Sequence, residues 1–155
     1  IATENMWNWD AKLDQASRCA CSDHDNFKAH MDALVDDYFV ACLDLGHAEM
    51  MGDFANAKDL VYALGDKCQA LHIHDNDKWH DSHQIPFSMD IDWTNVVKAL
   101  KEVGYCGYLT LEANSGLKKH TAQMVFAVVC EMAATARRLA NMYENACQYI
   151  AGFWK

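Results

Sequence analysis

Short apolar runs alternate with longer stretches of helical periodicity along the whole chain. Four runs are rich in aliphatic, aromatic and β-branched residues, which is typical of buried strands. They cover residues 1–6, 38–43, 68–74 and 107–112. Strands that alternate with helices in this way favour a parallel sheet with right-handed crossovers.

The segments between and after these strands carry the period of amphipathic helices. Gly65 suits the end of the second helix, Asp92 the N-cap of the third and Gly104 the position just past its end. The sequence predicts helices near residues 25–35, 56–64, 92–103 and from about 120 to 150.

The fold class predicted from this order is α/β, with four β–α units and a long C-terminal helix. A complete eight-stranded α/β barrel needs about 250 residues, whereas this chain has 155. Periodicity alone therefore fits both half a barrel and a small open sheet. No low-complexity stretch or linker divides the chain, so we expect residues 1–155 to form a single domain.

Charge and composition narrow the classes of partner. The chain carries 22 acidic against 13 basic residues, a net charge of −9, which argues against nucleic-acid binding because that needs a basic surface. No apolar run is long enough for a bilayer and no signal-peptide pattern is present, so we expect no membrane partner. The seven cysteines are scattered without a paired framework and predict free thiols in the cytoplasm.

Each predicted strand ends at an ionisable residue. These residues are Glu4, Asp44, His72 and Glu112. In parallel α/β folds the carboxyl ends of the strands meet at one edge, where functional sites are built. Three carboxylates gathered there would repel one another without a cation, and such an oxygen-rich set with one nitrogen suits Mn²⁺ or Mg²⁺, with Co²⁺ or Zn²⁺ as other candidates. The alternative is a set of ordinary polar strand ends.

Four segments together resemble motifs of the xylose isomerase-like barrel family, in the order of that family. They are residues 1–5 (IATEN), 42–48 (CLDLGHA), 71–77 (LHIHDND) and 107–112 (GYLTLE). The family includes sugar phosphate isomerases and epimerases, D-tagatose 3-epimerase-like enzymes and apurinic endonucleases. The resemblance implies a partial (β/α)₈ TIM barrel, with this chain as its C-terminal half, strands five to eight.

The same resemblance implies roles for individual residues. Glu4, Asp44, His72 and Glu112 would hold a divalent metal, with Mn²⁺ favoured, and Glu4 and Glu112 would also form the catalytic acid/base pair. His72 is preferred to His74 because the ligand histidine of the family is usually followed three residues later by an acid, which is Asp75 here. His74 is expected on the same strand face as His72 and is the fallback ligand.

A second group of residues is expected to contact the substrate. Its members are Trp7, His47, His74, Asp81 and His83. In the endonuclease branch the equivalents of His47, Asp81 and His83 bind an additional zinc, so a second metal is one alternative and a solvated polar loop is another. For Trp7 the alternative is packing at the barrel mouth.

The function implied is a metal-dependent sugar or sugar phosphate isomerase or epimerase, acting by proton transfer through an enediolate that the metal stabilises. The alternatives are an apurinic endonuclease-type hydrolase, an inosose-type dehydratase and an inactive half-barrel fragment. The partner would be a small sugar. Half a barrel would also have unpaired strand edges and an apolar inner face, which together predict a homo-oligomer. The inner face is expected to be built from residues such as Val40, Cys42, Leu71, Leu109 and Leu111.

Overall fold

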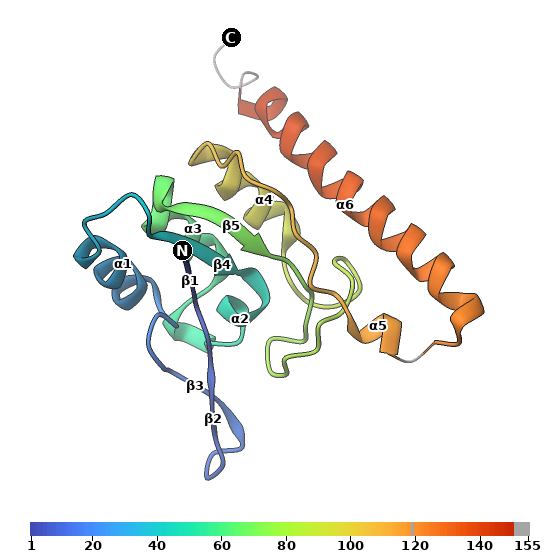
Figure 1. Cartoon of the computed structure of the whole chain (residues 1–155), viewed down its shortest axis with the longest axis horizontal. Helices are drawn as coiled ribbons and strands as arrows, with labels where there is room; N and C mark the ends of the chain where they lie inside the picture. Colours follow the sequence, from blue (N-terminus) through green and yellow to red (C-terminus); the bar gives the residue numbers. More distant parts are fainter. Residues whose placement is uncertain (119, 151–155) are drawn as a thin grey trace.

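The computed structural model describes residues 1–118 and 120–150, without the side chains of residues 147–150. Its main sheet is parallel and contains β1 (Ala2–Glu4), β4 (Val40–Asp44) and β5 (Cys68–His72), in that order (Figure 1). Three of the four predicted strands are thus confirmed, each somewhat shorter than the apolar run that predicts it.

Helices follow the strands as the periodicity predicts. Asp92 caps α4 by accepting hydrogen bonds from the backbone of Thr94 and Asn95, and Gly104 follows the helix with a positive φ of 72°, which glycine adopts without strain. The helices are α1 (His24–Ala33), α2 (Leu45–Glu49), α3 (Ala57–Leu64), α4 (Trp93–Glu102), α5 (Ser115–Lys118) and α6 (Ala122–Ile150), with 3₁₀ turns at Gly52–Phe54 and Gly65–Lys67.

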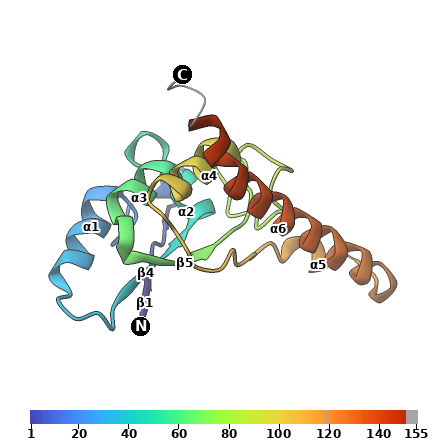
Figure 2. The same ribbon diagram turned by 90° about the horizontal axis from the view of Figure 1, so that it is seen from above.

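One face of the sheet is covered and the other is not. Figure 2 shows α1, α3 and α4 on the same side of β1, β4 and β5, with no helix on the opposite side. The core between these layers contains the fully buried Phe27, Leu43, Leu60 and Leu71. Burial of each such side chain contributes on the order of 1.5–3 kcal/mol, so this layer fixes the helices to the strands.

The inner, uncovered face of the sheet differs from the sequence-based expectation. It was expected to be lined by Val40, Cys42, Leu71, Leu109 and Leu111, but Leu71 is fully buried in the helix-side core and Leu109 and Leu111 pack against that core. Side chains alternate along a strand, so the inner face instead carries the intervening positions, among them Ala70 and His72. An inner face with small and polar side chains exposes less apolar area than predicted.

The predicted fourth strand, residues 107–112, is reduced to a single parallel bridge between Ile73 and Leu111. Ile73 donates a backbone hydrogen bond to Thr110, and Glu112 donates one to Ile73, both of 2.9 Å. Within the described residues this segment has a pairing partner on one side only, as β1 does. Its position beside β5 nevertheless matches the predicted strand order.

A β-hairpin that the sequence did not predict follows β1. It consists of β2 (Asn8–Asp10) and β3 (Gln15–Ser17), which are antiparallel, and it extends away from the main sheet (Figure 1). Trp7, at its base, is half-buried against the core and lies edge-on to Trp9, with 6.2 Å between ring centroids. Packing therefore accounts for much of the Trp7 surface.

The described chain carries no helix that is both long and apolar enough to cross a membrane. Its cysteines form no disulfide, in agreement with the predicted free thiols; they are Cys19, Cys21, Cys42, Cys68, Cys106 and Cys130. The side chain of Cys147 lies outside the described residues.

Candidate metal centre

Four ionisable side chains converge at the carboxyl ends of the strands. They are Glu4 at the end of β1, Asp44 at the end of β4, His72 at the end of β5 and Glu112 beside Leu111. Each offers one ligand atom, and these atoms all lie within 4.8 Å of one another. The parallel pairing of β1, β4 and β5 brings these residues together although they are far apart in the sequence.

His72 lies between the two glutamates of this group. Its Nδ1 atom is 2.7 Å from Oε1 of Glu4 and 3.2 Å from Oε2 of Glu112. The three side chains are 30–38% exposed, so a small molecule in the uncovered face of the sheet could reach them. One imidazole N–H cannot form a full hydrogen bond with each of two carboxylates, whereas a cation in the same place could bind both.

Asp44 is the buried member of the group, with a side chain 0% exposed. Its Oδ1 atom accepts a hydrogen bond from the His47 backbone at 2.7 Å and lies 3.1 Å from Nε2 of His74. Its Oδ2 atom has no hydrogen-bond partner. A buried carboxylate oxygen without a partner is costly, and a metal ligand at this atom would remove that cost. These residues fit a divalent cation with oxygen-rich ligation.

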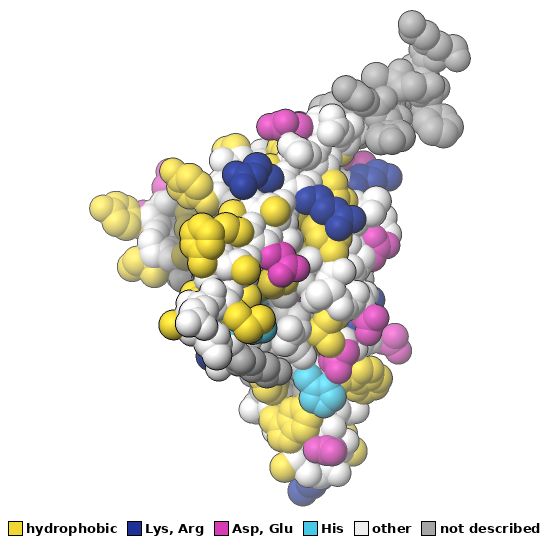
Figure 3. Space-filling view, turned by 90° about the vertical axis from the view of Figure 1, so that its right-hand side faces the viewer, with side chains coloured by type: hydrophobic (Ala, Val, Ile, Leu, Met, Phe, Trp, Pro, Cys, Tyr) yellow, Lys and Arg dark blue, Asp and Glu magenta, His cyan; other side chains and the backbone are white. Residues whose placement is uncertain are grey.

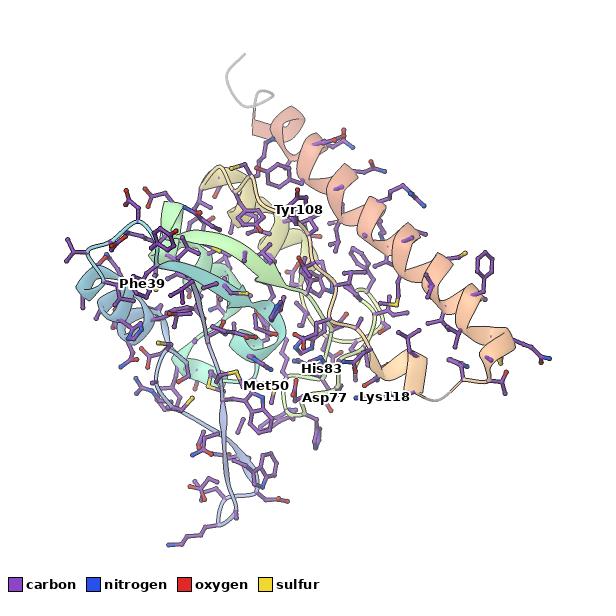
Figure 4. All side chains as sticks on the ribbon, in the orientation of Figure 1. Phe39, Met50, Asp77, His83, Tyr108 and Lys118 are labelled. Atoms are coloured by element: carbon purple, nitrogen blue, oxygen red, sulfur yellow. The ribbon has the colours of Figure 1, made fainter. Side chains whose placement is uncertain are left out.

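A second cluster lies next to the first and contains His47, His74, Asp81 and His83. The Nε2 atoms of the three histidines are 3.4, 3.7 and 3.1 Å from one atom, Oδ1 of Asp81. His74 and His83 stack with 4.1 Å between centroids, at 18°. Figure 4 shows His83 on the segment that follows β5, close to α5.

Backbone carbonyls fix the ring orientation of two of these histidines. Nδ1 of His47 lies 3.1 Å from the carbonyl oxygen of Asn5, and Nδ1 of His83 lies 2.8 Å from that of Glu112. A carbonyl only accepts, so both Nδ1 atoms carry the proton. The Nε2 lone pairs then face a carboxylate oxygen unless a proton or a cation lies between them. Metal-binding histidines commonly have this arrangement.

The pKa values of His47 and Asp81 are shifted in the directions expected for two groups that attract each other. Burial alone would lower the pKa of His47, but the hydrogen bond with Asp81 and the charge of Asp44 raise it to about 9. Burial alone would raise the pKa of Asp81, but the hydrogen bond from His47 and the charges of the histidines lower it to about 2. A metal-free cluster therefore holds a proton on His47, in the position where a cation could bind.

Sequence reasoning placed His74 on the same strand face as His72. In the structure β5 ends at His72, and the His74 ring instead belongs to the second cluster, completely buried. Its ring lies directly over Gly46, where a Cβ atom would be 2.1 Å from Cε1 of His74. Position 46 therefore requires glycine because of the His74 ring. This requirement depends on how the two segments pack together, so the sequence alone could not reveal it.

A further residue that sequence reasoning did not single out is Asn5. Its side chain is 1% exposed and forms two hydrogen bonds with the backbone of Asp44. In the sequence, its position next to Glu4 was the only sign that Asn5 belongs to the site.

A family model described as xylose isomerase-like TIM barrel matches residues 1–128. Among curated proteins, an uncharacterized protein, y4fM, of Sinorhizobium fredii is 33% identical over 76 residues, which are 49% of this chain and 24% of that protein. The match thus spans about a quarter of that relative.

Among solved structures, a D-tagatose 3-epimerase-like protein is similar with a TM-score of 0.56 and 22% identity, covering 83% of this chain and 49% of that one. An L-ribulose 3-epimerase has a TM-score of 0.56 and 16% identity, covering 91% and 49%. These likenesses are likenesses of fold. The chain spans about half the length of either structure, as a partial barrel would.

Proposed function

Because the chain belongs to the family of xylose isomerase-like TIM barrels, we propose that it contributes a divalent-metal centre to a sugar isomerase or epimerase. The observation that carries the proposal is the convergence of Glu4, Asp44, His72 and Glu112 at the strand ends. Two further facts support it: Oδ2 of Asp44 has no partner, and the similar folds include sugar 3-epimerases.

The two glutamates suit proton transfer. Glu4 and Glu112 come from opposite edges of the sheet and reach the same His72 nitrogen, so they stand on two sides of a common point. One carboxylate removes the proton from the carbon next to a sugar carbonyl, and the other returns a proton. Return on the opposite face gives an epimer, and return at the neighbouring carbon gives an isomer.

Asp44 and His72 are proposed as metal ligands that take no part in proton transfer. Asp44 is completely buried and hydrogen-bonded, so it holds its position while the exposed glutamates meet the substrate. These four residues would hold a divalent cation, with Mn²⁺ favoured, which would supply Lewis-acid polarisation of the carbonyl. The expected substrate contacts remain candidates: Trp7 at the base of the hairpin, and His47, His74, Asp81 and His83 in the second cluster.

Exchange of the α-proton with solvent tests this function. The 155-residue chain with added Mg²⁺ or Mn²⁺ would be incubated in D₂O with D-tagatose and with L-ribulose, the sugars that the names of the similar structures suggest. We expect loss of the α-proton signal in NMR spectra recorded after removal of metal and protein. Glu112→Gln should abolish the exchange, because glutamine keeps the shape but cannot accept the proton.

Glu131→Gln on the exposed side of α6 is the matched control and should leave exchange intact. No exchange by the unmodified chain with either sugar, or full exchange by Glu112→Gln, would contradict the proposal.

One observation favours a second candidate function, metal-dependent phosphodiester hydrolysis. The cluster of His47, His74, Asp81 and His83 could hold an additional cation, as the endonuclease branch of the family implies. The net charge of −9 opposes a DNA substrate. Cleavage of a duplex with an abasic site, dependent on His83, would favour this function over sugar chemistry.

A further inference from the structure

The ends of β1 and β4 are joined by a side chain. The register of these strands runs from Ala2 opposite Val40 to Glu4 opposite Cys42. At the next position Oδ1 of Asn5 accepts a hydrogen bond from the Asp44 backbone N–H at 2.7 Å, and Nδ2 of Asn5 donates one to the Asp44 carbonyl at 2.9 Å. Both ends of the Asn5 amide are thus used on one residue.

The backbone of Asn5 makes a third contact in the same region. Its carbonyl oxygen lies 3.1 Å from Nδ1 of His47. Asn5 is therefore hydrogen-bonded to both Asp44 and His47, and it follows Glu4 in the chain. It is completely buried, with 1% exposure, so water does not compete for these hydrogen bonds.

We propose that Asn5 is a positioning residue for the metal centre, holding the Glu4 and Asp44 carboxylates at a fixed separation by fastening the end of β1 to the end of β4. This inference rests on the proposed metal centre. The chain diverges beyond this point, into the hairpin on one side and α2 on the other. The backbone pairing of β1 with β4 ends at Glu4 and Cys42, and one step beyond it the Asn5 amide supplies the two hydrogen bonds to Asp44.

Metal centres depend on such supporting contacts. Ligands must be held to within about 0.5 Å of the binding geometry. Loss of a hydrogen-bond partner that supports a metal ligand typically weakens metal binding by about 10–100-fold. The same loss at a buried site elsewhere in the fold would lower stability without this effect.

Asn76 offers that comparison. It is also completely buried, its Nδ2 atom donates to the Gly46 carbonyl at 2.9 Å, and its Oδ1 atom accepts from the Lys78 backbone at 2.9 Å. It has the same side chain and the same number of hydrogen bonds to the backbone as the Asn5 amide. None of them involves the residues of the proposed metal centre.

The test is calorimetric titration of the 155-residue chain with Mn²⁺, for the unmodified protein, Asn5→Leu and Asn76→Leu, each below its melting temperature. We expect Asn5→Leu to bind Mn²⁺ about 10–100-fold more weakly and Asn76→Leu to bind with unchanged affinity, although both melt at lower temperature. Equal binding by the unmodified protein and Asn5→Leu would overturn this role alone. No binding by the unmodified protein would overturn the metal centre and this role together.

Asn5→Asp keeps the shape of the side chain and covers the case in which Asn5→Leu does not fold. Its added negative charge would by itself tighten cation binding. Weaker Mn²⁺ binding and a changed Co²⁺ d–d absorption spectrum are expected, because the donor to the Asp44 carbonyl is lost. Equal or tighter binding with an unchanged Co²⁺ spectrum would overturn the proposal.

Discussion

Nδ1 of His72 lies 2.7 Å from Oε1 of Glu4, although 68 residues separate the two in the sequence. They come from β5 and β1, which are not neighbours but flank β4 in the sheet. The contact therefore depends on the parallel order of all three strands, and it joins a candidate base to a candidate metal ligand across the centre of the site.

The pH dependence of stability should reveal the protonated state of His47. Its pKa in the folded chain is about 9, above the value of about 6.5 for an unfolded histidine. The stability that it contributes is therefore fully present below about pH 6.5 and is lost as the pH rises toward about 9. Without metal, the melting temperature should fall between about pH 6.5 and about pH 9.

His47→Asn should remove most of this fall, and His80→Asn, which changes a histidine whose side chain is 69% exposed, should not. Differential scanning fluorimetry in EDTA measures both. The same slope in His47→Asn and the unmodified chain would show that another group titrates.

Gly46→Ala should destabilise the fold through His74. The added Cβ would lie 2.1 Å from a ring atom of a completely buried side chain, and overpacking of this kind costs about 1–3 kcal/mol. For a chain of this size the melting temperature should fall by roughly 2–12 °C. In a His74→Ala background the same substitution should cost much less, because the obstructing ring is gone. Additive effects of the two changes would contradict the contact.

Self-association is the third expectation, because β1 and the bridge segment at Leu111 have no outer partner among the described residues. The face that carries α6 adds apolar surface: Figure 3 shows apolar side chains exposed among isolated charges, and Phe126 is 78% exposed. Sedimentation velocity should show dimers or larger species at micromolar concentration. A monodisperse monomer that melts cooperatively would contradict a homo-oligomer.

The sequence predicted the parallel alternation and the convergence of the strand ends because both follow from local patterns. Apolar runs define strands, and their carboxyl ends meet by topology, so Glu4, Asp44, His72 and Glu112 could be grouped without a structure. The helix limits at Gly65, Asp92 and Gly104 could likewise be predicted, because helix caps depend on the residues at the helix ends.

Other features depend on contacts that no local pattern encodes. Each strand of the β2–β3 hairpin has only three residues, too few to establish a strand period in the sequence. Residues 107–112 have strand composition, but their pairing in the structure is limited to one parallel bridge, between Ile73 and Leu111. The position of the His74 ring depends on the space left by Gly46, and the role of Asn5 depends on the backbone of Asp44 across the sheet.

The most direct test of the metal centre is anomalous diffraction from a crystal of this chain soaked in Mn²⁺. The account predicts an anomalous peak about 2.0–2.6 Å from one carboxylate oxygen each of Glu4, Asp44 and Glu112 and from a ring nitrogen of His72. Absence of a peak among these four side chains, or Mn²⁺ bound solely between His47, His74, Asp81 and His83, would contradict it.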